Sequence, residues 1–297
     1  PAPLSVNYHF TRTCNYACKF CYHTQTSTDV LTPSDAQRGL KLLVDAGMQK
    51  INFSGGEPFI VQRGRYVGDL VKFCKEQLGV SSCSIVSNGS LITEEWMKRY
   101  GTYLDILAIS CDSFDAETNR RLGRWAKRTE HITQLRKIAT WCMQYNIAFK
   151  MNTVVNTENI NECMVDNVSQ LNPIRWKLFQ CLLIEGENIG TRAKRDASTL
   201  AISTQQFNDF VELQRATAPS TLMIVPENNN DMRNSYLILD EQMRFLNCTT
   251  GGKIPSKSIL DIGVHAAMND SGFDVEAFYR RGGYYKWKKV QKVNECG

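Results

Sequence analysis

The chain has 297 residues, of which 42% are hydrophobic and 22% charged, a composition typical of a globular protein and unlike a disordered or fibrous chain. Lysine and arginine exceed aspartate and glutamate by 35 to 30, a net charge of +5 that is too small to argue for binding to duplex DNA or to a membrane. No apolar run approaches the roughly 18 residues of a membrane span. The eleven cysteines are too few for a disulfide scaffold, so we expect reduced thiols.

Predicted strands and helices alternate through the first two thirds of the chain. Strands are expected at 5–12, 50–54, 84–87, 106–110, 148–155 and 175–183. Helices are expected at 33–46, 66–78, 93–100, 131–145, 160–171 and 205–216. This alternation implies parallel βα units with right-handed crossovers. We therefore predict a partial (β/α)6 TIM-type barrel, laterally open, with its site at the C-terminal ends of the strands.

The strand–helix pattern weakens after residue 187. Residues 191–199 are dominated by polar and charged side chains, and the segment 236–297 is rich in glycine. We interpret residues 1–190 as the barrel core. Residues 191–297 are predicted to form a loop-rich C-terminal extension that closes the active site.

Three cysteines stand at C-x3-C-x2-C spacing directly after the first predicted strand: Cys14, Cys18 and Cys21. Three thiolates on one loop can ligate three corners of a cubane iron–sulfur cluster and leave one iron for an external ligand. The alternative is a zinc site with a distant fourth ligand, such as His23. The aromatic Phe20 before the third cysteine, and the position after strand one, favour the cluster.

This loop resembles that of the radical S-adenosylmethionine superfamily. The resemblance implies a [4Fe-4S] cluster whose fourth iron is chelated by the amino and carboxylate groups of S-adenosyl-L-methionine, which is cleaved to methionine and a 5′-deoxyadenosyl radical. A second family feature is the Ser-Gly-Gly-Glu-Pro sequence at 54–58. Gly55 and Gly56 would let the backbone approach the methionine moiety, and Glu57 would accept from its ammonium group.

The superfamily layout also implies cofactor contacts at the ends of strands three and four. Asn88 and Ser110 are assigned to the ribose of the cofactor, and Arg124 to the methionine carboxylate. Each of these residues, taken singly, is more simply explained as an ordinary loop residue. The assignment rests on their joint placement at the ends of the strands.

Polar residues repeat along one face of four predicted strands, although buried parallel strands should be almost wholly apolar. Residues two apart in a strand point the same way, so four pairs share a face: Asn7 with His9, Lys50 with Asn52, Lys150 with Asn152, and Arg175 with Lys177. A single such pair is usually a solvated edge. Four buried cations need a counter-charge, and we predict that a polyanion such as a nucleoside triphosphate supplies it.

The segments 52–58, 175–181, 185–188, 235–241 and 255–261 resemble the viperin-like enzymes of this superfamily. The resemblance implies dehydration of CTP or UTP. The radical removes the ribose 4′-hydrogen, the 3′-hydroxyl leaves as water, and one electron and a proton complete a 3′-deoxy-3′,4′-didehydro nucleotide, a chain terminator with antiviral potential. It places Asn7, Lys50, Asn52, Lys150, Asn152, Arg175 and Lys177 in the substrate pocket. Tyr236 becomes a late proton or hydrogen-atom donor, and Lys253 part of a closing phosphate loop.

The resemblance further implies an electron donor such as a flavodoxin-type or ferredoxin-type reductase. We expect a cytoplasmic monomer that binds no nucleic acid, with membrane or lipid-droplet attachment only through a helix ahead of Pro1. Two alternatives remain at this point. One is another radical S-adenosylmethionine enzyme, of molybdopterin biosynthesis or tRNA modification. The other is a metal-binding adaptor whose role is to bind a partner.

Overall fold

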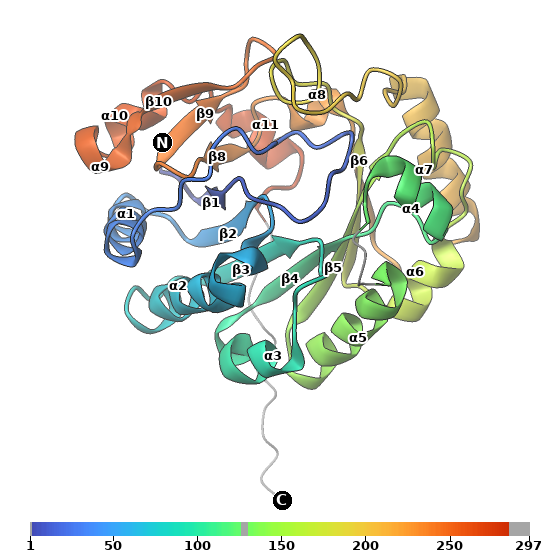
Figure 1. The fold of residues 1–297 in the computed structure, drawn as a ribbon, viewed down its shortest axis with the longest axis horizontal. Helices are drawn as coiled ribbons and strands as arrows, with labels where there is room; N and C mark the ends of the chain where they lie inside the picture. The colour runs from blue at the N-terminus through green and yellow to red at the C-terminus, as the bar shows by residue number, and fades with distance from the viewer. Residues whose placement is uncertain (1, 126–129, 285–297) are drawn as a thin grey trace, which may run out of the picture.

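The computed structural model describes residues 2–125 and 130–284, and its centre is one parallel sheet (Figure 1). Six neighbouring parallel strands follow the chain order: β1 (Ser5–Thr11), β2 (Lys50–Gly55), β3 (Ser82–Ser87), β4 (Ile106–Ser110), β5 (Ala148–Val155) and β6 (Arg175–Gln180). These are the six predicted strands. The partial barrel is confirmed, because the sheet does not close on itself within the described residues.

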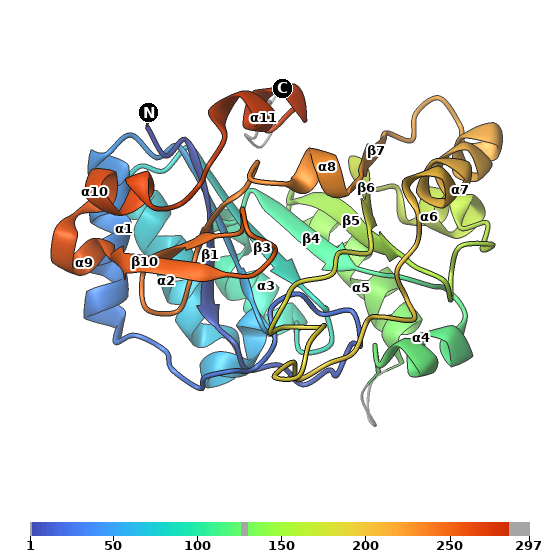
Figure 2. The same cartoon turned by 90° about the horizontal axis from the view of Figure 1, so that it is seen from above.

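The C-terminal extension adds four strands to this sheet. They are β7 (Ile224–Glu227), β8 (Leu237–Leu239), β9 (Arg244–Asn247) and β10 (Ile254–Ser258). Strand β7 pairs in parallel with β6, and β8 pairs in parallel with β1, so the extension lengthens the sheet at both edges. Figure 2 shows β10 and β7 at opposite sides of the sheet. The prediction of a loop-rich extension therefore missed four strands, because strands of three to five residues carry too few alternations to detect.

Six helices cover the outer face of the sheet: α1 (Pro33–Asp45), α2 (Arg65–Glu76), α3 (Glu94–Tyr100), α5 (His131–Gln144), α6 (Val165–Leu171) and α7 (Thr204–Thr217). The short helix α4 (Ala116–Leu122) was not predicted. Two 3₁₀ helices and four short α-helices complete the described structure: η1 (Pro58–Gly64), η2 (Gly101–Tyr103), α8 (Asn229–Met232), α9 (Ile259–Ile262), α10 (Val264–Asn269) and α11 (Val275–Arg280). No helix in the described residues is long and apolar enough to span a membrane.

Side-chain alternation separates the two faces of each strand. In β6, Trp176 and Leu178 are fully buried in the hydrophobic core, while Arg175 and Lys177 are only partly buried on the inner face. In β1, Val6 and Tyr8 belong to the same core. The polar faces inferred from the sequence therefore meet on the inner side of the sheet, where the candidate site lies.

Candidate active site

A cavity of about 740 Å³ lies against the inner face of the sheet and joins the cysteine loop to the polar strand faces. Its walls include nearly all the predicted site residues: Asn7, Cys14, Cys18, Phe20, Cys21, Lys50, Asn52, Gly55, Gly56, Asn88, Ser110, Arg124, Lys150, Asn152, Arg175, Lys177, Tyr236 and Lys253. Of the predicted set, Glu57 does not line it. Residues as far apart in the sequence as Asn7 and Lys253 thus surround one space.

The three loop cysteines are free, partly buried thiols. Burial raises the pKa of Cys14 to about 11 and that of Cys18 to about 12, and it also raises the pKa of Cys21. The Sγ atom of Cys14 accepts a hydrogen bond from the backbone N–H of Tyr16 at 3.4 Å. Such thiols are protonated until a metal binds, and cluster assembly would displace those protons.

The cysteine arrangement suits a cluster better than a single ion. The described residues contain no group of three or more His, Cys, Asp or Glu side chains placed to hold one metal ion. A cubane cluster carries its irons at separate corners, so its ligands do not converge on one point. His23, the fourth ligand in the zinc alternative, instead has its Nδ1 atom 3.0 Å from Lys253 Nζ. The three cysteines thus fit a [4Fe-4S] cluster.

The glycines after β2 bring two backbone segments together. A Cβ on Gly56 would lie 2.1 Å from the carbonyl oxygen of Thr13, and one on Gly55 would lie 2.2 Å from that of Thr11. Backbone hydrogen bonds join the same segments, from the Gly56 N–H to Thr11 and from the Glu57 N–H to Thr13. The glycines are therefore required for close contact between the backbone after β2 and the start of the cysteine loop. This requirement is separate from the approach to the methionine moiety that we predicted from the sequence.

The side chain of Glu57 has protein partners, and a contact with the ammonium group of the cofactor stays a prediction. The residue is fully buried, and its carboxylate accepts hydrogen bonds from Ser87 Oγ at 2.7 Å, the Asn88 N–H at 2.8 Å and the Phe59 N–H at 3.1 Å. Burial raises its pKa to about 7 against the opposing effect of these bonds. The carboxylate thus joins the segment after β2 to the end of β3.

Asn88 and Arg124 lie beside the cysteine loop as expected, but both already have partners. The Nδ2 group of Asn88 donates to Asn15 Oδ1 at 3.0 Å. Arg124 is buried, forms an ion pair with Asp112, and lies 5.6 Å from the ring centre of Phe20. The carboxylate of Asp112 thus balances the charge of Arg124. Pairing of Arg124 with the methionine carboxylate of the cofactor stays a prediction.

Neutral polar groups form a ladder across the first three strands. Asn52 Nδ2 donates to Asn7 Oδ1 at 2.8 Å, and Ser84 Oγ donates to Asn52 Oδ1 at 2.9 Å. Further along the sheet, Ser110 pairs in register with Asn152, and Asn152 with Lys177. Asn152 therefore connects the strand end assigned to the cofactor with the cationic region.

The cations gather on β2, β5 and β6, where Lys150 pairs in register with Arg175. Burial, together with the nearby charges of Lys177 and Arg175, lowers the pKa of Lys50 to about 7. Burial also lowers the pKa of Lys177 to about 8, although Glu227 opposes this, and it lowers the pKa of Lys150 strongly. Positive charge is thus concentrated in a space where each ammonium group is held at a cost.

Two residues that we did not predict complete this region. Glu227 of β7 forms ion pairs with Lys177 and, at 3.7 Å, with Arg281. The Tyr236 hydroxyl donates to Glu227 and accepts from Lys177 Nζ at 2.8 Å, and Arg281 stacks 3.7 Å from its ring centre. A protein carboxylate therefore supplies part of the counter-charge that we assigned wholly to a ligand. The only sequence signal was a glutamate ending the short apolar run Ile224–Glu227.

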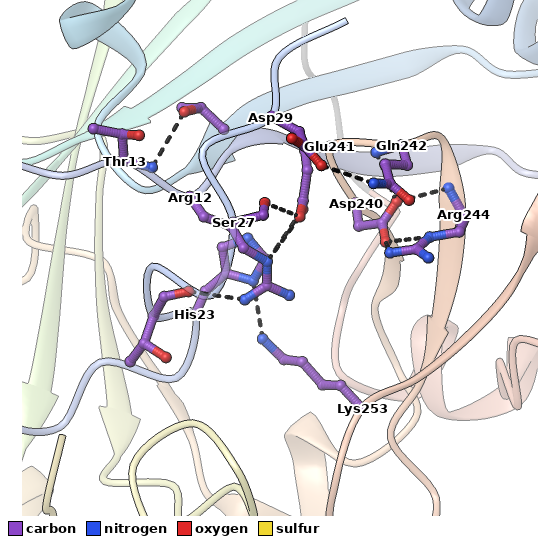
Figure 3. A network of polar contacts seen from close by, with 12 residues as sticks. Arg12, Thr13, His23, Ser27, Asp29, Asp240, Glu241, Gln242, Arg244 and Lys253 are labelled. Carbon is purple, nitrogen blue, oxygen red and sulfur yellow. Dashed lines mark hydrogen bonds and ion pairs between the residues drawn. The ribbon is translucent and has the colours of Figure 1, made fainter. Parts of the chain in front are cut away.

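Lys253 lies at the cysteine-loop end of the cavity. Its Nζ atom is 3.2 Å from Glu187, which also pairs with Arg12 at 3.0 Å, and Arg12 pairs with Glu241 at 3.1 Å. Figure 3 shows Arg12 against Glu241, with Lys253 reaching toward His23. This buried network ties the extension to the segment that follows the cysteines. Lys253 therefore has a carboxylate partner already, and a contact with phosphate stays a prediction.

Comparison with known proteins agrees with this geometry. The family model described as the radical SAM superfamily matches residues 8–164. The chain is 57% identical over 288 residues to an S-adenosylmethionine-dependent nucleotide dehydratase of Danio rerio, covering 97% of this chain and 79% of the relative. This chain belongs to the radical SAM superfamily, in the family of S-adenosylmethionine-dependent nucleotide dehydratases. The predicted resemblance is thus confirmed.

More distant relatives extend the match. An S-adenosylmethionine-dependent nucleotide dehydratase of Flammeovirga pacifica is 32% identical to this chain, and the match covers 96% of each of the two chains. Two solved structures share the fold. Native anSMEcpe with bound AdoMet matches with a TM-score of 0.66 at 13% identity, covering 94% of this chain and 83% of the other. Streptococcus suis SuiB bound to S-adenosylmethionine matches with a TM-score of 0.65 at 17% identity, covering 93% of this chain and 67% of the other. At these identities they support the fold class alone.

Proposed function

We propose that this chain is an enzyme that removes water from a pyrimidine ribonucleoside triphosphate, CTP or UTP, to form the 3′-deoxy-3′,4′-didehydro nucleotide. The observation that carries the proposal is a single cavity lined by both the three-cysteine loop and the cationic strand faces. The relatives are named as nucleotide dehydratases, and this supports dehydration as the class of reaction. An adaptor protein would leave the cationic faces without a purpose, and the names of the relatives favour dehydration over a different radical reaction.

The cofactor end of the cavity would be built from the cysteine loop and the ends of β2 to β4. Cys14, Cys18 and Cys21 would hold the [4Fe-4S] cluster. When bound, the cluster and S-adenosyl-L-methionine supply a 5′-deoxyadenosyl radical that removes a hydrogen atom from the substrate ribose. Asn88 and Ser110 would bind the cofactor ribose, since both lie at strand ends that line the cavity.

The substrate end would be built from the cations of β5 and β6. Lys150, Arg175 and Lys177, with Lys50 of β2 beside them, would bind the triphosphate, because charge-assisted hydrogen bonds to phosphate are strong in a buried site. The amides of Asn7 and Asn52 offer neutral hydrogen bonds to the nucleoside. This arrangement places the phosphates away from the cluster and the ribose between the two ends.

Tyr236 is suited to give a proton or hydrogen atom to the substrate late in the reaction. Burial, assisted by Glu227, raises the pKa of Tyr236 well above its usual value, so the phenol keeps its proton. Its hydrogen bond with Lys177 connects the donor to the phosphate-binding region. Tyr236 would therefore lie beside the bound phosphates.

A nucleotide panel tests the proposed reaction. The protein, reconstituted anaerobically with iron and sulfide, is mixed with S-adenosyl-L-methionine, dithionite and one nucleotide at a time. We expect 5′-deoxyadenosine, and a nucleotide product lighter by one water, with CTP or UTP. Tyr236→Phe should lower product formation by about a hundredfold, a typical loss for a removed proton donor. Formation of 5′-deoxyadenosine without a dehydrated nucleotide from any pyrimidine triphosphate would contradict the proposal.

Triphosphate affinity is expected to fall as the pH rises above 7. Phosphate binding favours charged lysine, so it raises the pKa of Lys50 from its value of about 7 in the free protein. Below that pH the group is already protonated. Above it each binding event takes up a proton, and one such group lowers the affinity by up to about tenfold per pH unit.

Titrations of CTP and UTP between pH 6.5 and 9, together with Lys50→Arg as a matched control, would measure this effect. Arginine stays protonated, so the variant should lose the dependence just above pH 7. Lys177, with a pKa of about 8, would add its own dependence at higher pH. An affinity that is flat from pH 7 to 9 in the wild type would refute a role for these lysines in binding phosphate.

The remaining assignments concern organisation and partners. We propose that residues 1–190 form the catalytic core and that residues 191–297 close the site, with the Lys253–Glu187 ion pair as one tie between them. We further propose a cytoplasmic monomer that receives electrons from a flavodoxin-type or ferredoxin-type reductase. Sedimentation analysis of the reconstituted protein would test the monomer, and a dimer at micromolar concentration would contradict it.

A further inference from the structure

A second hollow, of about 1000 Å³, lies in the outer helix layer between α2, α3 and the start of α5. Figure 1 shows α3 and α5 side by side in this layer. Gln134 of α5 donates to the carbonyl oxygen of Ile92 at 2.8 Å and so joins α5 to the segment between β3 and α3. We call this hollow the outer groove. The catalytic cavity, by contrast, lies on the inner face of the sheet.

The outer groove carries a surplus of positive charge. Four exposed cations line it, Arg63, Arg65, Arg99 and Lys137, against two carboxylates, Glu95 and Glu130, so that its formal charge is 4 − 2 = +2. Leu91, which is 37% exposed, adds apolar surface to the same wall. A basic rim around an apolar spot favours a protein partner with an acidic face.

The backbone that presents Arg63 is strained. Gln62, Arg63 and Gly64 have consecutive φ angles of 50°, 54° and 80°. The left-handed region is unfavourable for the two non-glycine residues. Trp96 holds the turn by donating from Nε1 to the carbonyl oxygen of Gly64 at 2.8 Å. Strain that the surrounding structure maintains is common at functional sites, and here it turns an arginine into the groove.

The wall of the outer groove is connected to the cysteine loop. Ser90 lines the groove, and its Oγ accepts from Asn15 Nδ2 at 2.9 Å and donates to Asn88 Oδ1 at 2.6 Å. Asn88 Nδ2 in turn lies 3.9 Å from Cys14 Sγ. Two side chains therefore separate the groove surface from a thiol assigned to the cluster.

We propose that the outer groove docks an acidic one-electron donor protein, of the flavodoxin or ferredoxin class, which reduces the cluster. This inference rests on the proposed function, because only a redox enzyme of this kind needs such a partner. In the docking complex the donor is oxidised by one electron and the cluster is reduced by one, and no bond forms or breaks. Entry from the outer side leaves the inner cavity free for S-adenosyl-L-methionine and nucleotide.

The test compares two double charge reversals on the same two helices. Arg99→Glu with Lys137→Glu changes cations that line the groove. Lys98→Glu with Arg136→Glu changes exposed cations next to them in sequence that do not line it. Both pairs alter the net charge equally, so only the position differs. The rate of cluster reduction by reduced flavodoxin is followed by the loss of cluster absorbance, at low and high salt and without nucleotide.

We expect the groove pair to slow reduction by flavodoxin about tenfold at low salt, with the difference shrinking at high salt because salt screens exposed charges. The control pair should stay within about twofold of wild type, and dithionite should reduce all three proteins alike. Equal rates for both pairs would overturn the proposal. So would slow reduction of the groove pair by dithionite, which would locate the defect at the cluster. Because nucleotide is absent, failure of the dehydration reaction leaves this result unaffected.

Discussion

Cys18→Ala is expected to abolish both cluster assembly and cleavage of S-adenosyl-L-methionine. The cluster leaves one iron for the cofactor, so three protein thiolates are the whole ligand set, and each supplies one corner. Cys14 and Cys21 alone cannot complete it. Iron and sulfide content, cluster absorbance and 5′-deoxyadenosine formation should all fall to background in the reconstituted variant.

A buried cysteine outside the loop provides the control for this variant. Cys74 of α2 is fully buried in the hydrophobic core, so Cys74→Ala should retain the cluster and lose only stability, about 1 kcal/mol. Circular dichroism would verify that both variants are folded. Full iron content and activity in Cys18→Ala would refute the cluster assignment. Loss of the cluster from a folded Cys74→Ala would show that the ligand set was chosen wrongly.

Lys177→Ala is expected to weaken triphosphate binding by about ten- to a hundred-fold, because a charge-assisted contact in a buried site is worth roughly 1.5–3 kcal/mol. The loss should be reinforced by Glu227, which would remain near the phosphates without its Lys177 partner and with Arg281 at 3.7 Å. The preference for triphosphate over monophosphate should narrow as well. Titrations of CTP and UTP, and of their mono- and diphosphates, in the presence of S-adenosyl-L-methionine would measure both effects.

Glu227→Gln is the matched control, and its expected effect on triphosphate affinity is the opposite of that of Lys177→Ala. It keeps the shape of the side chain but removes the negative charge that competes with phosphate for Lys177. We expect triphosphate to bind more tightly to this variant than to the wild type. Affinity for S-adenosyl-L-methionine should change little in either variant, since its proposed ligands lie at the other end of the cavity. Equal affinity of the wild type for monophosphate and triphosphate would remove the physical basis of the substrate assignment.

Much of the fold and of the site was predictable because the signals are local. Six strands and most of the helices follow from alternation and periodicity within short windows. The cysteine loop follows from its spacing together with Phe20 and its position after the first strand. The cationic faces were also predictable. In β5 and β6, Lys150 and Lys177 each lie two positions from another polar residue, and side chains two apart share a face of a strand.

The sequence by itself thus determined the cysteine loop and the polar strand faces, whereas only the tertiary structure decided what stands opposite them. Tyr236 meets Lys177 across 59 positions of the chain, and Glu227 reaches the same lysine because β7 pairs with β6. Pairings between short, distant strands leave no periodic trace in the sequence. The same limit applies to Glu57, whose carboxylate accepts hydrogen bonds at the end of β3, from Ser87 and from the Asn88 N–H. Local patterns predict which face a side chain occupies, and long-range pairing decides its partners.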